Sequence, residues 1–355
     1  MRIVQVMPEF GLAGAEIMCE NLTYQLQKLG HEVTVISMYN FHSAITERLE
    51  KSGVEVRYMN KKSGIDFSQI LKMKKHFKEI RPDVVHTHRY CAQYAIPAAI
   101  LAGVKRRVHT VHNIAQKENI TMARKLNKFF FKFCSLVPVA LSDLIRDSIV
   151  EEYGFEDEKI PVIFNGIDLL KCIPKEEYSI TGNFKILHIG RFSEQKNHIG
   201  LIKAFHEFYK SHSDSELWLI GDGEKRPEIE QYVNENGMAS CVKFLGLQSN
   251  VYGFLQEADI FVLPSNYEGI PITLIEAMGT GLPIVATNVG GVSDMLTNSE
   301  NALVIENDID QIVKSFEDYY NDKQKRETYG KKAKERAIAF SAETMAKKYA
   351  ELYKK

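Results

Sequence analysis

Short apolar runs of strand length alternate with longer amphipathic stretches along the first half of this chain. The runs are rich in residues that favour β-structure, so they predict strands. These expected strands cover residues 2–7, 32–37, 54–58, 83–88, 107–112, 137–142 and 160–164. Apolar residues at helical spacing predict helices over 15–29, 67–80 and 94–102. Strands that alternate with helices predict a parallel, doubly wound sheet with right-handed crossovers.

The same alternation begins again after a segment without clear periodicity. Residues 169–184 follow a turn signal, and we expect them to form a linker. The next strands are expected at 185–190, 217–220, 242–246, 260–263, 283–286 and 302–305. We therefore predict an α/β protein with two Rossmann-like domains, at 1–168 and 185–338, and a final helix within 339–355. Ligands should bind at the carboxyl ends of the strands, in a cleft between the domains.

The composition is that of an ordinary globular protein, because 45% of the residues are hydrophobic and 26% are charged. A length of 355 residues fits about two domains. The five cysteines are scattered without a C-x-x-C pair, which argues against a disulfide framework and a cysteine zinc site. The first apolar run is too short for a signal peptide, and no stretch of about 18 apolar residues occurs. We expect a cytoplasmic protein.

Positive charge is concentrated in one part of a nearly neutral chain. Residues 60–140 hold 16 Lys or Arg against 4 Asp or Glu, although the net charge of the whole chain is −1. Within this region, residues 120–137 interleave four phenylalanines with four basic residues, which are Arg124, Lys125, Lys128 and Lys132. The pattern resembles an interfacial helix, and a core helix with a solvated basic face is the alternative. We predict peripheral docking of 60–140 to an anionic membrane at its inner face. Nucleic acid is not an expected partner, since no nucleic-acid-binding motif accompanies the charge.

The stretch 260–291 combines a strand, a glycine-bearing loop and a helix expected over about 272–279. The loop at Gly269 lets backbone N–H groups approach a ligand, and the first helical turn leaves amides free to bind an anion. Glu268 and Glu276 flank these amides, and each carboxylate can accept hydrogen bonds from two hydroxyl groups. This arrangement suits a ligand with phosphates and several hydroxyls. Two solvated carboxylates at a helix end are the alternative.

Two basic residues follow the first strand of the second domain. The planar guanidinium of Arg191 and the ammonium of Lys196 suit a bound diphosphate. A solvated Arg/Lys pair is the alternative. No Asp-x-Asp motif ends a strand, so we expect these two residues and the helix amides to neutralise the diphosphate without a metal ion or a cofactor.

The segment Glu268-Gly-x-Pro-x-x-x-x-Glu276-Ala-Met, followed by Gly281-x-Pro283 and Gly290-Gly291, resembles the signature of the retaining GT-B glycosyltransferases of the glycosyl transferases group 1 type. The resemblance covers nearly the whole chain. It implies a GT-B fold, in which two Rossmann-like domains face each other and the C-terminal helix crosses back. It also implies transfer of a hexosyl or related sugar, with retention, from a UDP- or GDP-sugar to a saccharide or polyprenyl-linked acceptor. Such a reaction would serve the synthesis of cell-surface polysaccharide or glycoconjugate.

The resemblance gives roles to the residues of the second domain. Glu268 would face the hydroxyls of the transferred sugar, and Glu276 would accept hydrogen bonds from the ribose hydroxyls. Arg191 and Lys196 would hold the leaving diphosphate, while Gly246, at a strand end, would lie near the base. The backbone that assists Glu268 would belong to Gly269, Ile270, Pro271 and Ile272.

Two further candidates lie in the first domain. The segment Gly11-Leu-Ala-Gly14-Ala-Glu16 lacks the glycine spacing of a dinucleotide site, but it resembles the Gly-x-x-Gly-x-Glu turn of the family. Gly14 would approach the donor diphosphate and Glu16 would orient the turn; a plain strand-to-helix turn is the alternative. His112 matches the family position closest to the anomeric carbon, where it would position or polarise the sugar without acting as a general base. A buried structural histidine is the alternative there.

Two other functions stay open at this point. A nucleotide-sugar epimerase shares the scaffold, although we would expect a different carboxylate arrangement. A non-catalytic sugar-nucleotide-binding or assembly protein would be expected to have lost part of the set Arg191, Lys196, Glu268 and Glu276. An NAD oxidoreductase is disfavoured, because the dinucleotide glycine spacing is missing.

Overall fold

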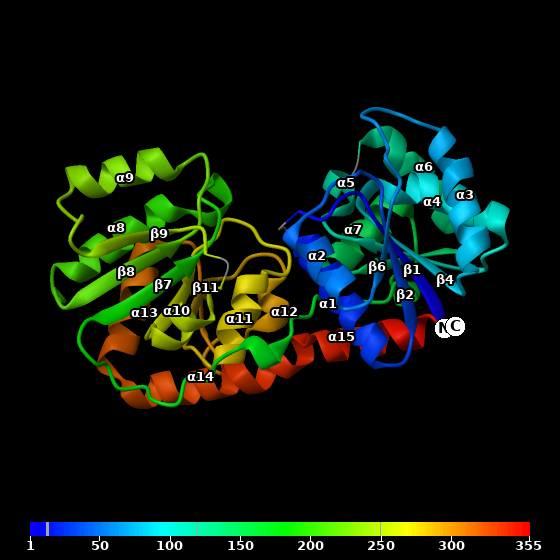
Figure 1. The fold of residues 1–355 in the computed structure, drawn as a ribbon. Coiled ribbons are helices and arrows are strands. Elements are labelled where there is room, and N and C mark those ends of the chain that lie inside the picture. Colours follow the sequence, from blue (N-terminus) through cyan, green and yellow to red (C-terminus); the bar gives the residue numbers. More distant parts are fainter. Residues whose placement is uncertain (12–13, 119, 249) are drawn as a thin grey trace. The chain divides into compact units, whose positions relative to one another are not determined.

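The computed structural model describes residues 1–11, 14–118, 120–248 and 250–355. They form two compact units: unit 1 consists of Met1–Gly166 with Ala342–Lys355, and unit 2 consists of Ile167–Ser341. Each unit contains one six-stranded sheet with helices around it (Figure 1).

The sheet of unit 1 is parallel, with the strand order β3-β2-β1-β4-β5-β6. Its central strands are buried along almost their whole length, as expected where helices cover both faces of a parallel sheet. The strands are β1 (Arg2–Met7), β2 (Glu32–Ser37), β3 (Glu55–Tyr58), β4 (Val84–His88), β5 (Arg106–Val111) and β6 (Leu136–Ala140). The helices are α1 (Gly14–Lys28), α2 (Ala44–Lys51), α3 (Ser68–Ile80), α4 (Ala92–Ala102), α5 (Ala115–Glu118), α6 (Thr121–Phe133), α7 (Asp143–Tyr153) and α15 (Ala342–Leu352), with 3₁₀ turns η1 (Arg89–Cys91) and η2 (Asp157–Lys159).

The prediction of a strand over 160–164 is wrong. That segment forms only an isolated parallel bridge, in which Ile163 N donates to Ala140 O and Ala140 N donates to Pro161 O. Pro161 has no N–H group, so the segment cannot extend the ladder in the N-terminal direction.

The C-terminal helix α15 belongs to unit 1, where it packs against α1. Two buried tyrosines attach this end of the chain to the sheet. Tyr349 Oη lies 2.7 Å from Thr110 Oγ1, and Tyr353 Oη lies 2.7 Å from His86 Nδ1. Unit 1 is therefore assembled from both ends of the chain.

The sheet of unit 2 is also parallel, with the order β12-β11-β10-β7-β8-β9. The strands are β7 (Phe184–Ile189), β8 (Ser215–Ile220), β9 (Val242–Gly246), β10 (Ile260–Leu263), β11 (Ile284–Thr287) and β12 (Leu303–Ile305). The helices are α8 (His198–Tyr209), α9 (Arg226–Glu235), α10 (Tyr252–Glu257), α11 (Ile272–Thr280), α12 (Val292–Met295), α13 (Ile309–Asn321) and α14 (Lys323–Ala337), with 3₁₀ turns η3 (Leu169–Lys171), η4 (Glu194–Lys196) and η5 (Ile338–Phe340).

The segment 169–184, expected to be a linker, is part of unit 2 and packs against the end of α11. Lys175 N donates to Thr280 O at 2.8 Å, and the Tyr178 hydroxyl donates to Gly281 O at 2.8 Å. Both bonds lie at the end of α11, so this segment also braces the helix that follows the Glu268 loop.

Candidate functional site

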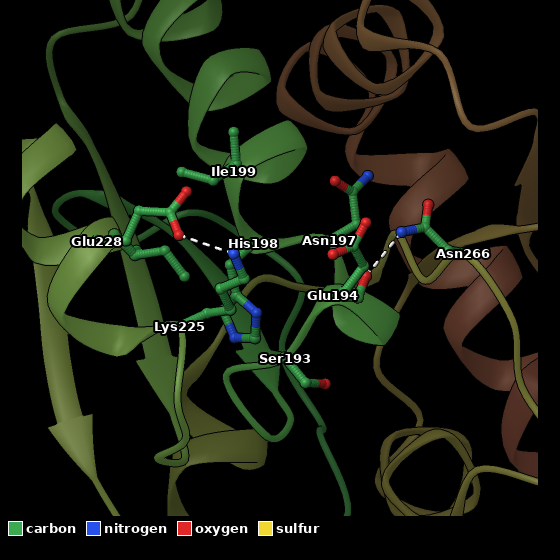
Figure 2. Close-up of a pocket in the computed structure, with 9 residues that line it drawn as sticks. Ser193, Glu194, Asn197, His198, Ile199, Lys225, Glu228 and Asn266 are labelled. Atoms are coloured by element: carbon green, nitrogen blue, oxygen red, sulfur yellow. Dashed lines mark hydrogen bonds and ion pairs between the residues drawn. The ribbon is translucent and has the colours of Figure 1, made fainter.

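The loops after β7 and β10 meet at the carboxyl edge of the unit 2 sheet. These two strands are neighbours at the point where the strand order reverses, and open α/β sheets bind ligands outside such a point. Asn266 joins the loops, because its backbone N–H donates to Gln195 O at 2.8 Å and its side-chain amide donates to Glu194 O at 2.7 Å (Figure 2). The Gln195 amide returns a bond to Tyr267 O at 2.9 Å.

Lys196 and Glu268 form an ion pair at this junction. Lys196 Nζ lies 2.5 Å from Glu268 Oε1, and the two side chains are only 14% and 5% exposed. The Ser265 hydroxyl donates to the same carboxylate oxygen at 2.6 Å. A buried carboxylate needs such partners, and an ammonium group with three N–H donors can hold it and still bind a further anion. The structure therefore brings these two predicted site residues into direct contact.

Two glycines after β11 allow the Glu268 loop to lie where it does. A Cβ on Gly290 would lie 1.8 Å from Glu268 O, and one on Gly291 would lie 2.3 Å from Gly269 O. Gly290 also has a φ of +54°, in the left-handed region that favours glycine. Only a backbone without side chains can pass this closely behind Glu268.

Helix α11 begins directly after this loop, at Ile272. Pro271 stands at the N-cap position without a side-chain cap, so the first turn keeps backbone amides that no capping side chain satisfies. Together with the loop at Gly269 and Ile270, these amides and the positive end of the helix dipole favour an anion.

Glu276 lies one turn inside α11 and is partly buried. Burial raises the pKa of its carboxyl group to about 7, although a hydrogen bond from the Tyr252 hydroxyl and the charge of Lys171 both oppose this rise. The charge of this carboxyl group therefore changes near neutral pH.

Arg191 and Gly246 lie apart from the Lys196–Glu268 pair. The Arg191 side chain is 75% exposed, and its Nη2 lies 3.2 Å from Glu224 Oε2. Such an exposed pair is weak, which leaves the guanidinium able to change partner. Gly246 ends β9 with a φ of +66° and accepts a hydrogen bond from Gly221 N, at the end of β8.

The candidates of unit 1 gather at the carboxyl ends of β1, β4 and β5. Helix α1 begins at Gly14. The predicted Gly-x-x-Gly-x-Glu turn includes Leu12 and Ala13, which lie outside the described residues. The buried Glu16 carboxylate pairs with Arg89 Nη1 at 2.9 Å. Arg89 follows β4 directly with a φ of +52°, and sequence reasoning missed it. A basic residue immediately after a buried strand was the available signal.

His112 follows β5 and is partly buried. Its backbone N–H donates to Glu118 Oε1 at 2.8 Å, and its Nε2 lies 3.0 Å from His88 Nδ1. Burial, with the nearby His109 and Arg89, lowers the pKa of His112 to about 3. The imidazole is thus uncharged at neutral pH, which agrees with a positioning role and not with that of a cation.

A pocket of about 270 Å³ opens beside the same β7 loop, at the start of α8 and α9 (Figure 2). Lys225 and Glu228, which both line it, form an ion pair with 2.9 Å between Nζ and Oε2. None of the predicted site residues lines this pocket. We therefore place the candidate site at the Lys196–Glu268 junction, where predicted site residues meet, and not in this cavity.

Within the described part of the chain, no group of three or more His, Cys, Asp or Glu side chains is arranged to hold a metal ion. The absence of a metal requirement stays a prediction.

The sequence is similar to known glycosyltransferases. Residues 173–336 match the family described as Glycosyl transferases group 1, and residues 12–170 match Glycosyltransferase Family 4. The chain is 30% identical over 278 residues to UDP-Gal:alpha-D-GlcNAc-diphosphoundecaprenol alpha-1,3-galactosyltransferase of Escherichia coli, covering 73% of this chain and 71% of that protein. It is 25% identical over 288 residues to N-acetylgalactosamine-N,N'-diacetylbacillosaminyl-diphospho-undecaprenol 4-alpha-N-acetylgalactosaminyltransferase of Campylobacter jejuni, covering 78% of each.

Solved structures agree on the fold. A glycosyltransferase from Rickettsia africae superposes with a TM-score of 0.86 at 20% identity, covering 99% of this chain and 97% of that one. Anabaena HepE, solved in complex with UDP and glucose, superposes with a TM-score of 0.80 at 20% identity, covering 99% and 98%. The two parallel six-stranded sheets and the solved structures show the two-domain GT-B fold. Because it matches both family descriptions and is 30% identical to the E. coli enzyme, this chain belongs to the glycosyl transferases group 1 family.

Proposed function

We propose that this glycosyltransferase moves a hexosyl or related sugar from a UDP- or GDP-sugar to a saccharide or polyprenyl-linked acceptor, with retention and without a metal ion. The observation that carries the proposal is the Lys196–Glu268 pair beside the uncapped start of α11, with Glu276 one turn further on. The E. coli and C. jejuni relatives support the acceptor class, since the names of both contain a diphosphoundecaprenol group.

In this proposal the cationic groups bind the diphosphate and the carboxylates bind hydroxyl groups. The α11 amides, Lys196 and the exposed guanidinium of Arg191 would meet the negative charge that develops on the leaving diphosphate. Glu268, fixed by Ser265, would accept hydrogen bonds from the transferred sugar through its second oxygen. Glu276 would bind the ribose hydroxyls. Rate enhancement would then come from positioning and charge stabilisation.

The test is a transfer assay with purified protein, a panel of UDP- and GDP-sugars and diphosphate-linked lipid acceptors, run with and without EDTA. We expect acceptor-dependent release of the nucleoside diphosphate, unchanged by EDTA, and a product whose anomeric coupling constant in ¹H NMR matches that of the donor. An inverted product would contradict retention. Conversion of the donor to an epimer without acceptor would favour the epimerase instead.

We also propose that unit 1 docks on an anionic membrane surface. Helix α6 buries Ala123, Phe130 and Phe131 but leaves other apolar side chains more than half exposed, namely Ile120 at its start, Met122, Phe129 and Phe133. Lys125, Lys128 and Lys132 are exposed on the same helix. Exposed aromatic and basic side chains together are typical of an interfacial helix, whereas a plain solvated face would be polar.

Further exposed apolar side chains occur in the same basic region of the chain, at the start of α3. Helix α4 packs on both α6 and α3. Ile65, Phe67 and Leu71, at the start of α3, are each more than half exposed. Among the described helices, none is long and apolar enough to cross a bilayer.

Co-sedimentation with vesicles tests the docking surface. We expect binding to vesicles of phosphatidylcholine with phosphatidylglycerol and little binding to phosphatidylcholine alone, since basic residues near the surface are attracted to anionic lipid. The double variant Phe129→Ser/Phe133→Ser should lose most of it. Leu170→Ser, which changes an exposed apolar residue of unit 2, is the matched control and should not. Equal binding to both kinds of vesicle would contradict the proposal.

A further inference from the structure

A chain of buried hydrogen bonds runs from α1 through the unit 1 sheet to His112. Gln5 Nε2 lies 3.0 Å from Thr23 Oγ1, Gln5 Oε1 lies 2.9 Å from His88 Nε2, and His88 Nδ1 lies 3.0 Å from His112 Nε2. Thr23, Gln5 and His88 are fully buried, so water cannot replace any of these partners. Of the four side chains, only that of His112, which follows β5, is not fully buried.

The direction of this chain follows from its buried end. The Thr23 hydroxyl donates its single hydrogen to Cys19 O at 2.8 Å, so its oxygen accepts from the Gln5 amide. Gln5 Oε1 then faces His88, and it also accepts from Cys19 Sγ at 3.5 Å. Burial and the nearby Glu16 raise the pKa of the Cys19 thiol, so the thiol stays protonated and can donate. The Gln5 oxygen is thereby fixed as an acceptor.

This arrangement determines which ring nitrogen of each histidine is protonated. His88 must donate from Nε2 to Gln5 Oε1, and burial lowers its pKa well below the ordinary value, which keeps the ring uncharged. A neutral imidazole that donates from one nitrogen accepts at the other. His88 Nδ1 is therefore an acceptor, and His112 Nε2 carries the hydrogen between the two rings.

The reversed chain is less favourable. Turning the Gln5 amide around would require the Thr23 hydroxyl to leave Cys19 O, and it would direct an amide N–H at the Cys19 sulfur, which is a weak acceptor. One good hydrogen bond would be lost inside the core, where an unmade bond is costly.

We propose that Thr23, Gln5 and His88 act as positioning residues that hold His112 in the Nε2–H tautomer, so that its Nδ1 presents a lone pair to a hydroxyl group of the sugar substrate. Among the residues that the structure describes, none hydrogen-bonds this nitrogen. The identity of the hydroxyl as that of a sugar rests on the proposed function; the tautomer does not. His112 then selects an uncharged hydrogen-bond donor, and a substrate with an ether or a hydrogen in that place binds less well.

Histidine ¹⁵N NMR on the full chain tests the tautomer directly, because protonated and unprotonated ring nitrogens have well-separated shifts. With the His112 signals assigned by their loss in His112→Asn, we expect a protonated Nε2 and a bare Nδ1. Gln5→Leu removes the acceptor of His88 and should give His112 a mixed or reversed tautomer. Thr23→Val is nearly isosteric and should shift His112 in the same direction if Gln5→Leu does not fold.

Tyr353→Phe is the matched control. It removes the hydroxyl that pairs with His86 Nδ1 in the same buried cluster but leaves the Thr23–Gln5–His88–His112 chain intact, so His112 should keep its tautomer. A protonated Nδ1 in the wild-type protein, or an unchanged tautomer in both chain variants, overturns the proposal. Since the spectrum needs no turnover, a failed transfer assay would refute the function and leave the tautomer result standing.

Discussion

The proposed contact between Glu276 and the ribose predicts that donor binding depends on pH, because burial raises the pKa of this carboxyl group to about 7. Ribose hydroxyls donate hydrogen bonds, so they need the ionised carboxylate, which accepts at both oxygens. With a pKa of about 7, roughly a tenth of Glu276 is ionised at pH 6 and roughly nine tenths at pH 8. Donor affinity should therefore rise about tenfold between these pH values, which is about 1.4 kcal/mol of binding free energy.

Isothermal titration calorimetry with an intact nucleotide sugar measures this ratio, since a doubly esterified diphosphate does not titrate in this range. Burial lowers the pKa of His112 to about 3 and that of His188 to about 4, so neither histidine changes charge between pH 6 and pH 8. Tyr252→Phe removes the hydroxyl that donates to Glu276, and it should move the midpoint to higher pH.

Glu276→Gln is the decisive control for this prediction. Its affinity should be weak and independent of pH, because an amide presents one acceptor and does not titrate. A tenfold ratio that survives in Glu276→Gln, or a wild-type affinity that does not change with pH, would refute the assignment of Glu276 to the ribose.

Two further predictions concern the stability of the Glu268 loop. Gly290→Ala places a Cβ 1.8 Å from Glu268 O at a φ of +54°, and should lower the free energy of unfolding by about 1–3 kcal/mol in a denaturant titration. The control Gly253→Ala in α10, where a Cβ would meet no atom within 4 Å, should be neutral or stabilising. Similar losses of stability in both variants would contradict the close approach. Lys196→Met leaves Glu268 buried without its cation and should cost about 3–5 kcal/mol. The double variant Lys196→Met/Glu268→Gln should regain much of that stability while donor binding stays weak, and a double variant no more stable than the single one would count against the ion pair.

The sequence predicted that Lys196 and Glu268 would meet at one edge of the unit 2 sheet, because strand order and strand ends suffice to bring them together. Lys196 follows β7 and Glu268 follows β10, and any doubly wound sheet with these strands adjacent puts both residues at one edge. Their direct ion pair was not predicted, since the resemblance gave one residue to the diphosphate and the other to the sugar. The exposure of Arg191 also depends on side-chain packing that no motif encodes.

The unit 1 site was harder to predict, because its contacts join residues far apart in the chain. Arg89 reaches Glu16 from another strand end, and Gln5 reaches His88 from the neighbouring strand. Each of these residues is ordinary in its local sequence, and only the tertiary arrangement makes it part of a site. The strand expected over 160–164 failed for a local reason that was visible, namely the proline at 161.

The most direct test of the central claim is a crystal structure of the protein with a bound nucleotide sugar. We predict that the diphosphate lies within hydrogen-bonding distance of Lys196, Arg191 and the first amides of α11, with the ribose on Glu276. A diphosphate bound elsewhere, for instance in the pocket between α8 and α9, would contradict the account.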